Sequence, residues 1–196
     1  MLFRSPVNRL LKRAFDLAVA VPVVALILPP LCGWVWLCQR RQAPGPLFHT
    51  RERCGRRGHE FPMLKFRTMR TVAPDAPAEA KQAVHEDARV FPLGRFMRRH
   101  SLDEFPQFWN VLVGDMSLVG PRPELVEVVE RYEPWQHQRH LVKPGLTGLW
   151  QVSRRGEGLM YLYTDLDLEY ISTMSFRSDV GILLKTLPAA LSRSGS

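Results

Sequence analysis

An apolar run of 25 residues, from Ala14 to Cys38, constrains the fold of this chain more than any other feature. Its single charged residue, Asp16, lies near its start. A helix of this length rises about 37 Å, which exceeds the roughly 30 Å of a bilayer core. Trp34 and Trp36 lie near the end of the run, and indole rings favour the membrane interface. The run therefore predicts a membrane-embedded helix.

Two features of this run oppose a straight crossing of the membrane. Pro22 lies in its middle, and a proline inside a helix removes a hydrogen bond and kinks the axis. Basic residues flank both ends, and they are Arg4, Arg9, Lys12, Arg13, Arg40, Arg41, Arg51, Arg53, Arg56 and Arg57. Because positive charge marks the cytoplasmic side, both ends favour the same side. We expect a re-entrant helix within residues 1–40, broken near Pro22, with a kinked straight span as the alternative.

The charge of the chain is concentrated in the same region. The 196 residues carry a net charge of +8, and residues 1–70 hold 13 Lys and Arg against 3 Asp and Glu. Since this basic third contains the apolar run, an anionic membrane surface is a better partner than nucleic acid, and we expect no nucleic-acid partner. Three Cys without a C-x-x-C pair argue against a disulfide framework and a zinc site.

Residues 41–196 are expected to form one cytoplasmic domain, which makes the chain a helix-rich α+β protein with short strands and amphipathic helices at the interface. Within 46–67 the pattern predicts two short extended pieces around a turn at Gly55–Gly58. Residues 71–88 are rich in Ala, Pro, Glu and Asp and predict a mobile loop. Helices are expected over 93–100, 104–113, 123–140, 159–174 and 179–191, and a short strand is expected over 149–152.

An adjacent acid pair, Asp103-Glu104, lies in the stretch densest in chemistry-bearing residues. Arg98 precedes the pair and Arg122 follows it between two prolines. Cations that neutralise phosphate oxygens, beside a carboxylate that attacks phosphorus or holds a metal, are what phosphoryl transfer requires. The alternative is a capping box, because Ser101 and Glu104 match S-x-x-E. The pattern alone favours the cap.

Further candidate site residues have equally simple structural alternatives. Lys65 and Arg67 alternate to one side of a predicted strand and would bind phosphate together, or would form a solvated face. Arg122 is suited to a bidentate phosphate contact, or to a buried ion pair with Glu124. Asp167 would add a metal ligand, or would belong to an acidic helix face.

Several blocks of the chain, taken in order, resemble one known family. They are KRAFD at 12–16, Gly45-Pro46, KFRTM at 65–69, the stretch 101–124, KPGLTGLWQV at 143–152 and DLEY at 167–170. The chain resembles the bacterial sugar transferases, which are monotopic polyprenyl-phosphate phosphoglycosyl transferases. The resemblance runs over almost the whole chain and favours the catalytic interpretation of the acid pair.

The resemblance implies transfer of a sugar-1-phosphate from a UDP-sugar to undecaprenyl phosphate, with release of UMP. The reaction would start synthesis of a glycan such as exopolysaccharide, O-antigen or capsule, on the cytoplasmic face of the bacterial inner membrane. Asp103 would be the nucleophile that forms a covalent phosphosugar intermediate, and Glu104, together with Asp103, would hold Mg²⁺. Asp167 would lie near the metal or the acceptor. The residues expected to hold phosphates are Lys65, Arg67, Arg98 and Arg122. The family also has a re-entrant helix broken at a proline, which maps to Pro22.

Three positions depart from the family pattern. Val21 precedes Pro22 where the family has Ser, Arg51 replaces a Gln, and Ser153–Gly156 replaces Gly-Arg-Asn. The sugar is therefore not predicted, and both a monomer and a homodimer are compatible with the sequence. The competing hypothesis is a membrane-anchored interaction protein in which the acid pair only caps a helix.

Overall fold

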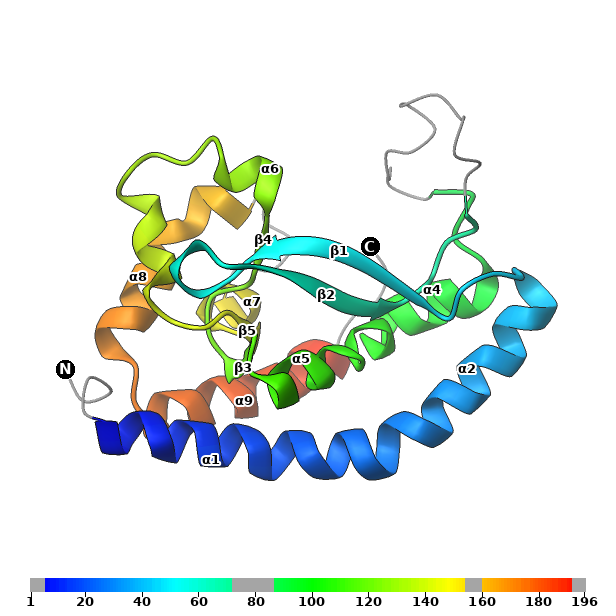
Figure 1. Ribbon diagram of the computed structural model, residues 1–196, viewed down its shortest axis with the longest axis horizontal. Helices are drawn as coiled ribbons and strands as arrows, with labels where there is room; N and C mark the ends of the chain where they lie inside the picture. The colour runs from blue at the N-terminus through cyan, green and yellow to red at the C-terminus, as the bar shows by residue number, and fades with distance from the viewer. Residues whose placement is uncertain (1–5, 72–86, 154–159, 192–196) are drawn as a thin grey trace.

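The computed structural model describes residues 6–71, 87–153 and 160–191 (Figure 1). The predicted loop at 71–88 falls almost entirely outside these residues. The longer helices are α1 (Pro6–Pro22), α2 (Leu28–Gln42), α4 (Pro92–Arg99), α5 (Gln107–Val113), α8 (Thr164–Thr173) and α9 (Phe176–Leu191). The shorter helical segments are η2 (Val23–Ile27), η3 (Arg56–Gly58), η4 (Leu102–Glu104), α6 (Val126–Val129), η5 (Gln136–Leu141), α7 (Leu149–Ser153) and η6 (Met160–Tyr163). The expected helix-rich α+β class is confirmed.

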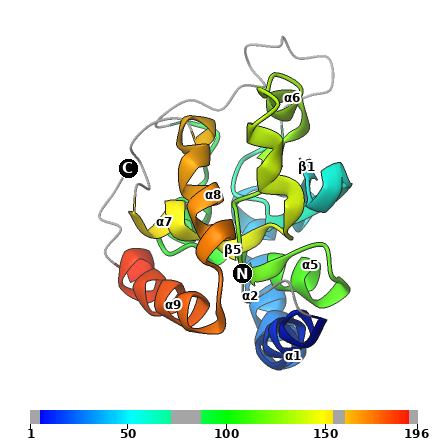
Figure 2. The ribbon, with the colours of Figure 1, turned by 90° about the vertical axis from the view of Figure 1, so that its left-hand side faces the viewer.

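Two small sheets form the centre of the domain. Strands β1 (Phe48–Cys54) and β2 (Glu60–Phe66) form an antiparallel hairpin, and β4 (Glu124–Leu125) pairs with the far end of β1. Strands β3 (Ser117–Val119) and β5 (Gly145–Thr147) form a parallel pair. The two extended pieces predicted around the glycine turn are thereby confirmed, with η3 as the turn. Helices α5 and α8 lie on opposite sides of β5 in Figure 2.

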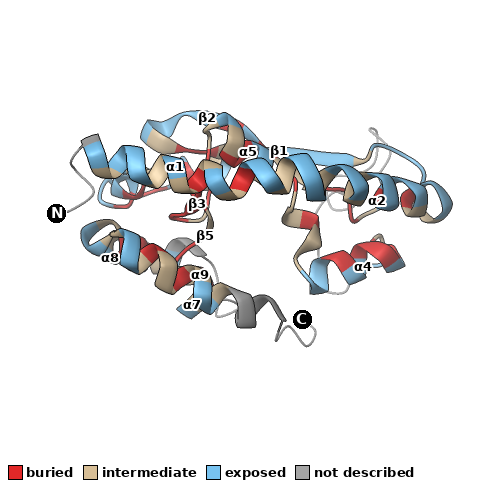
Figure 3. Ribbon diagram, turned by 90° about the horizontal axis from the view of Figure 1, so that it is seen from below, coloured by how far each residue is buried: buried red, intermediate tan, exposed pale blue. Residues whose placement is uncertain are grey.

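The apolar run forms one long helix of three parts, α1, η2 and α2, along the lower side of the domain (Figures 1 and 3). The helix continues through Pro22 and widens to π-helical geometry in η2 directly after it. Proline rings at positions 29 and 30 crowd the carbonyls four residues earlier, which belong to Ala25 and Leu26. The wider π turn at those carbonyls accommodates the rings, because π segments relieve such interruptions of the hydrogen-bond ladder.

Two apolar clusters hold the domain on this helix. One cluster joins Ala20 of α1 to Phe61, Val111 and Tyr170, and the other joins Val35 of α2 to Phe66 and to α4. The helix is also fixed by polar contacts at its two ends. Lys12 donates to Val119 O and Gln39 donates to Arg67 O, so the two halves of the helix are bound to β3 and to the chain after β2.

Two predicted elements are wrong. The helix expected over 123–140 is replaced by β4, α6 and η5, because residues 124–125 pair with the edge of β1 and Pro134 interrupts the helical pattern. The strand expected over 149–152 is the helix α7. Strand β5 ends at Thr147, and Gly148 after it has no room for a side chain, since a Cβ there would lie 2.2 Å from the carbonyl oxygen of Gly120. Residues 149–153 then turn away and pack against α8 and α9.

The helix α4 lies so close to the chain after β2 that one position in it has no room for a side chain. A Cβ at Gly94 would lie 2.1 Å from the backbone oxygen of Thr68. We expect Gly94→Ala to lower the free energy of unfolding by about 2 kcal/mol or more, because backbone must move. Gly181 in α9 has open space, so Gly181→Ala should gain about 0.5–1 kcal/mol from helix propensity.

Unfolding of both variants in the same detergent, followed by circular dichroism against denaturant, checks this pair. Equal stabilities for the two variants would contradict the close packing of α4.

Candidate active site

The acid pair lies on η4, a single 3₁₀ turn between α4 and α5. Ser101 precedes it in the left-handed region (φ 55°) and makes no side-chain cap to the turn. The next helix begins at Gln107, after Pro106 in the N-cap position. The capping-box interpretation is therefore wrong, because the helix that it would cap begins after the acid pair.

Glu104 is the centre of a cluster drawn from three elements. Its Oε1 accepts a hydrogen bond from Lys65 Nζ of β2 at 2.8 Å and another from Arg122 Nη2 at 2.8 Å. Burial alone would raise the pKa of Glu104, but Arg122 and Lys65 outweigh burial and hold that pKa well below its usual range. Glu104 is thus a fixed anion between two cations.

Asp103 is in a different environment, although it is the neighbouring residue. It is only 8% exposed, and among the described residues no other side chain donates a hydrogen bond to its carboxylate. Burial raises the pKa of Asp103 and Glu104 adds to that rise, while Lys65 and Arg98 oppose it. A buried carboxylate without a bonding side chain, beside cations, has the properties of a nucleophile for a phosphate substrate.

Of the four predicted phosphate-binding residues, Lys65 and Arg122 bind Glu104 directly. Arg98 lies near Asp103, and Arg67 lies outside the cluster. Arg98 acts on the pKa of Asp103 and donates from Nε to Thr68 Oγ1 at 2.9 Å. Arg67 instead is 4% exposed and donates to the backbone oxygens of Ala43, Pro46 and Met69. The predicted shared face of Lys65 and Arg67 is wrong, because β2 ends at Phe66 and Arg67 turns into the backbone around the end of α2.

Asp167 is also held away from direct contact with the acid pair. Its carboxylate pairs with Arg139 at 2.7 Å, and both side chains are almost fully buried. Burial raises the pKa of Asp167 to about 6, although Arg139 opposes this shift. Arg139 also donates a hydrogen bond to the backbone oxygen of Arg122 at 2.8 Å. Asp167 is therefore linked to Glu104 indirectly, through Arg139 and Arg122.

The sequence analysis missed Arg139, which orients the backbone of Arg122. It lies in a polar stretch with no motif, so only the fold reveals its function. Arg122 does form an ion pair, as its alternative predicted, but the partner is Glu104 at 2.8 Å and not Glu124. Glu124 pairs with Arg53 instead, at 3.7 Å.

The donor set around the pair fits a magnesium ion only in part. No cluster of three or more His, Cys, Asp or Glu occurs among the described residues. Magnesium is usually held by one or two carboxylates together with substrate phosphates. Among the described residues, the two hydrogen bonds to Glu104 both use Oε1, so Oε2 is available as an oxygen donor to a metal. The residues therefore fit a metal that a phosphate substrate helps to bind.

The chain matches the family model described as "Bacterial sugar transferase" over residues 7–193. This match covers most of the chain, and the chain belongs to the bacterial sugar transferase family. The family predicted from the sequence blocks is thereby confirmed.

Curated relatives agree with this family. A UDP-galactose-lipid carrier transferase of Erwinia amylovora is 38% identical over 96% of this chain and 42% of its own length. A UDP-glucose:undecaprenyl-phosphate glucose-1-phosphate transferase of Escherichia coli is 42% identical over 93% of this chain and 40% of its own length. The chain thus spans about two fifths of the length of these relatives. It matches 90% of the exopolysaccharide production protein ExoY of Rhizobium meliloti, at 34% identity over 97% of this chain.

The long helix is compatible with a membrane location. Residues Val7–Gln42 are long and apolar enough to cross a bilayer, and only 11% of the most apolar window is buried within the protein. The core helix of a soluble domain would be mostly buried, whereas large parts of α1 and α2 are coloured as exposed in Figure 3. The exposed apolar side chains include Leu26, Ile27 and Leu37. This exposed apolar surface is compatible with a helix that lies in a membrane.

Proposed function

We propose that this chain transfers a sugar-1-phosphate from a UDP-sugar to undecaprenyl phosphate through a covalent intermediate on Asp103. The observation that carries the proposal is the contrast within the acid pair. Asp103 is buried and receives no side-chain hydrogen bond within the described part of the chain, while Glu104 is fixed by Lys65 and Arg122. The relatives, which include a UDP-galactose-lipid carrier transferase and a UDP-glucose:undecaprenyl-phosphate glucose-1-phosphate transferase, support the donor and acceptor classes.

The proposed reaction has two displacements at the same phosphorus. An Asp103 carboxylate oxygen attacks the sugar-bearing phosphorus of the donor, and the bond to the bridging oxygen breaks, so UMP leaves with that oxygen. An oxygen of undecaprenyl phosphate then attacks the phosphorus of the acyl phosphate. The Asp103 carboxylate is regenerated and the product is a lipid diphosphate sugar. The intermediate separates a soluble donor from a lipid acceptor, so the two need not be bound together.

The surrounding residues have distinct functions in this proposal. Arg98, Lys65 and Arg122 neutralise phosphate oxygens as negative charge develops in the transition state. Glu104 orients Lys65 and Arg122 through its Oε1. Glu104, with Asp103 beside it, would hold Mg²⁺ jointly with the donor diphosphate, and the ion would supply charge neutralisation there.

We further propose that the Val7–Gln42 helix is re-entrant and enters one leaflet from the cytoplasmic face. Two contacts near its opposite ends support this topology. Lys12 Nζ donates to Val119 O at 3.0 Å, and Gln39 Nε2 donates to Arg67 O at 2.8 Å. Both acceptors belong to the single domain of residues 41–196, which cannot lie on two sides of a bilayer. Exposed Phe96 and Trp109 would contact the same interface.

The proposed function is tested by UMP release from the purified protein in lipid nanodiscs. UDP-sugars are supplied singly with magnesium, with and without undecaprenyl phosphate. We expect continuous UMP release that requires the lipid phosphate for one donor, and a single burst without it. Release of no UMP from any UDP-sugar, by protein shown to be folded, would contradict the proposal.

The rate of the burst should depend on pH through Asp103. Because burial raises the pKa of Asp103, its reactive ionised form is lost at a higher pH than in an exposed aspartate, whose pKa is about 3.9. The burst rate should therefore fall as pH is lowered toward that raised pKa. Glu104 stays ionised, since its pKa is held well below its usual range.

Rapid-quench measurement without lipid acceptor checks this pH profile, because the acceptor phosphate itself titrates at about pH 6. A rate that stays constant down to about pH 4 would exclude Asp103 as the titrating nucleophile.

A further inference from the structure

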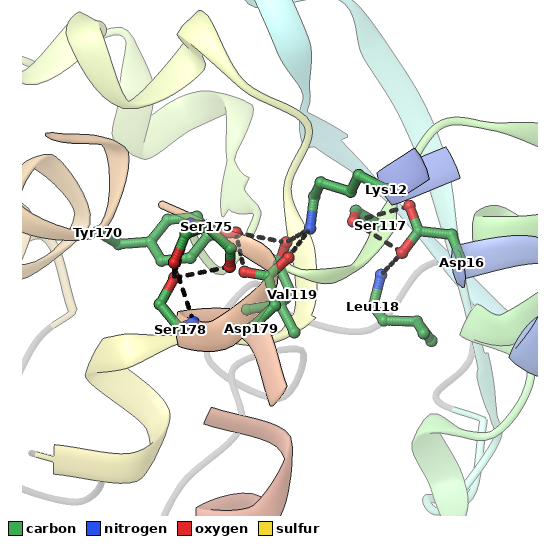
Figure 4. A network of polar contacts seen from close by, with 9 residues as sticks. All are labelled: Lys12, Asp16, Ser117, Leu118, Val119, Tyr170, Ser175, Ser178 and Asp179. Atoms are coloured by element: carbon green, nitrogen blue, oxygen red, sulfur yellow. Dashed lines mark hydrogen bonds and ion pairs between the residues drawn. The ribbon is translucent and has the colours of Figure 1, made fainter. Parts of the chain in front are cut away.

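Strand β3 is fixed along its length by the membrane helix (Figure 4). Asp16 of α1 accepts hydrogen bonds from Ser117 Oγ at 2.9 Å and from Leu118 N at 3.0 Å. Lys12, one turn earlier on α1, donates to the carbonyl oxygen of Val119 at 3.0 Å. Three consecutive residues of β3 are thus bound by two side chains of the same helix, in a buried interface.

The carbonyl of Val119 is the point where this interface meets the rest of the domain. Tyr170 Oη of α8 donates to the same oxygen at 3.1 Å and to Asp179 Oδ1 at 2.8 Å. Lys12 pairs with Asp179 Oδ2 at 2.6 Å, and the two side chains are 14% and 1% exposed. Lys12 therefore links α1, β3 and α9 through two acceptors (Figure 4).

The backbone between Val119 and Arg122 is fixed at every residue. Gly120 N donates to Thr147 O at 2.9 Å, Pro121 O accepts from Gly145 N at 2.9 Å, and Arg122 O accepts from Arg139. The backbones at Gly120 and Gly145 lie so close together that a Cβ at Gly145 would lie 2.1 Å from Gly120 N. We expect a displacement of Val119 to shift the Arg122 backbone with it, because the short segment between them and its hydrogen-bonded partners would move as one unit.

We propose that Lys12 is a positioning residue for Arg122, so that docking of the membrane helix sets the place of a phosphate-binding arginine. The inference rests on the proposed function, because Arg122 is assigned there to the donor phosphates. Lys12 itself touches neither the acid pair nor Arg122. It acts by holding the Val119 carbonyl, three residues before Arg122 in the fixed segment.

A double-mutant cycle on the UMP burst tests this proposal. Lys12→Met keeps the apolar stem and removes the donor, and we expect about a 10- to 100-fold loss in burst rate, as a misplaced catalytic group produces. In an Arg122→Ala background, Lys12→Met should lower the burst rate by less than about twofold, because the residue through which Lys12 acts is gone. If the loss in burst rate of the double variant equals the product of the losses in the two single variants, the residues act independently and the proposal is overturned.

Arg9→Met is the matched control, because Arg9 is an exposed basic residue of the same helix. It removes the same charge from the membrane flank, and its burst rate should stay within about twofold of wild type. Equal rates for the Lys12→Met and Arg9→Met proteins would overturn the positioning role.

Tyr170→Phe extends the test to a variant that leaves the Lys12–Asp179 pair in place. It deletes the hydroxyl that donates to Val119 O and to Asp179 Oδ1 without opening a cavity. The resulting loss in burst rate should likewise disappear in the Arg122→Ala background. If Lys12→Met does not fold, this variant decides the outcome alone. Wild-type protein that releases no UMP defeats the proposed function, and this inference with it. Wild-type turnover with independent losses defeats only the inference.

Discussion

Replacement of Asp103 by Asn should abolish sugar-phosphate transfer, with a loss of at least about a thousandfold in UMP release. The amide has nearly the same shape, so the buried position can accommodate it, but it has no anionic oxygen to attack phosphorus. Since Asp103 carries a carboxylate in an 8% exposed position, removing the charge should not destabilise the fold. Both the burst without lipid and the turnover with lipid should disappear together.

The matched control for this change is Glu130→Gln. Glu130 is an exposed acid after α6, and the substitution makes the same carboxylate-to-amide change outside the cluster. UMP release by the control should equal that of wild type. Full turnover by the Asp103→Asn protein would rule out Asp103 as the nucleophile.

Replacement of Glu104 by Gln should damage both stability and activity. Lys65 and Arg122 share Glu104 as their anionic partner, so the change leaves two partly buried cations facing a neutral amide. We expect the free energy of unfolding to fall by about 2 kcal/mol, because breaking one member of such a pair leaves charge uncompensated. Activity should fall at least about a hundredfold, since Arg122 and Lys65 lose their orientation.

Denaturant unfolding in detergent and a magnesium titration of UMP release check the Glu104→Gln protein. If Glu104 is a ligand, half-maximal activity should require more magnesium than in wild type. The stability loss should shrink at acid pH. The pKa of Glu104 is lower in the folded protein than in the unfolded chain, so its ionised carboxylate stabilises the fold at pH values above the unfolded-state pKa. This stabilisation is lost as the pH falls through the folded-state pKa. If the Glu104→Gln protein has the stability and the magnesium dependence of wild type, Glu104 is neither the stabilising partner of Lys65 and Arg122 nor a magnesium ligand.

The sequence predicted the elements with strong local signals. The apolar run, the glycine turn of the hairpin and the α4 and α8 helices all depend on patterns within a few residues of one another. The acid pair was also found, because two adjacent acids among arginines are locally unusual. The family resemblance favours the catalytic interpretation of the pair over the capping box.

The arrangement around the pair was not predictable in the same way. Lys65 and Arg122 lie 39 and 18 residues from Glu104 in the chain, so only the tertiary fold brings them to one oxygen. Arg67 resembles Lys65 in sequence, yet its burial against backbone carbonyls depends on how α2 ends. The helix expected over 123–140 failed for a related reason, since pairing with β1 overrode its local periodicity.

The central claim is that the sugar phosphate becomes covalently attached to Asp103, and intact-protein mass spectrometry tests it most directly. The protein is mixed with an active UDP-sugar and magnesium without lipid acceptor, and then quenched. We expect one added sugar-phosphate per chain, located to Asp103 by peptide mapping and removed on adding undecaprenyl phosphate. Unmodified protein under conditions that give a full UMP burst, or attachment at another residue, would contradict it.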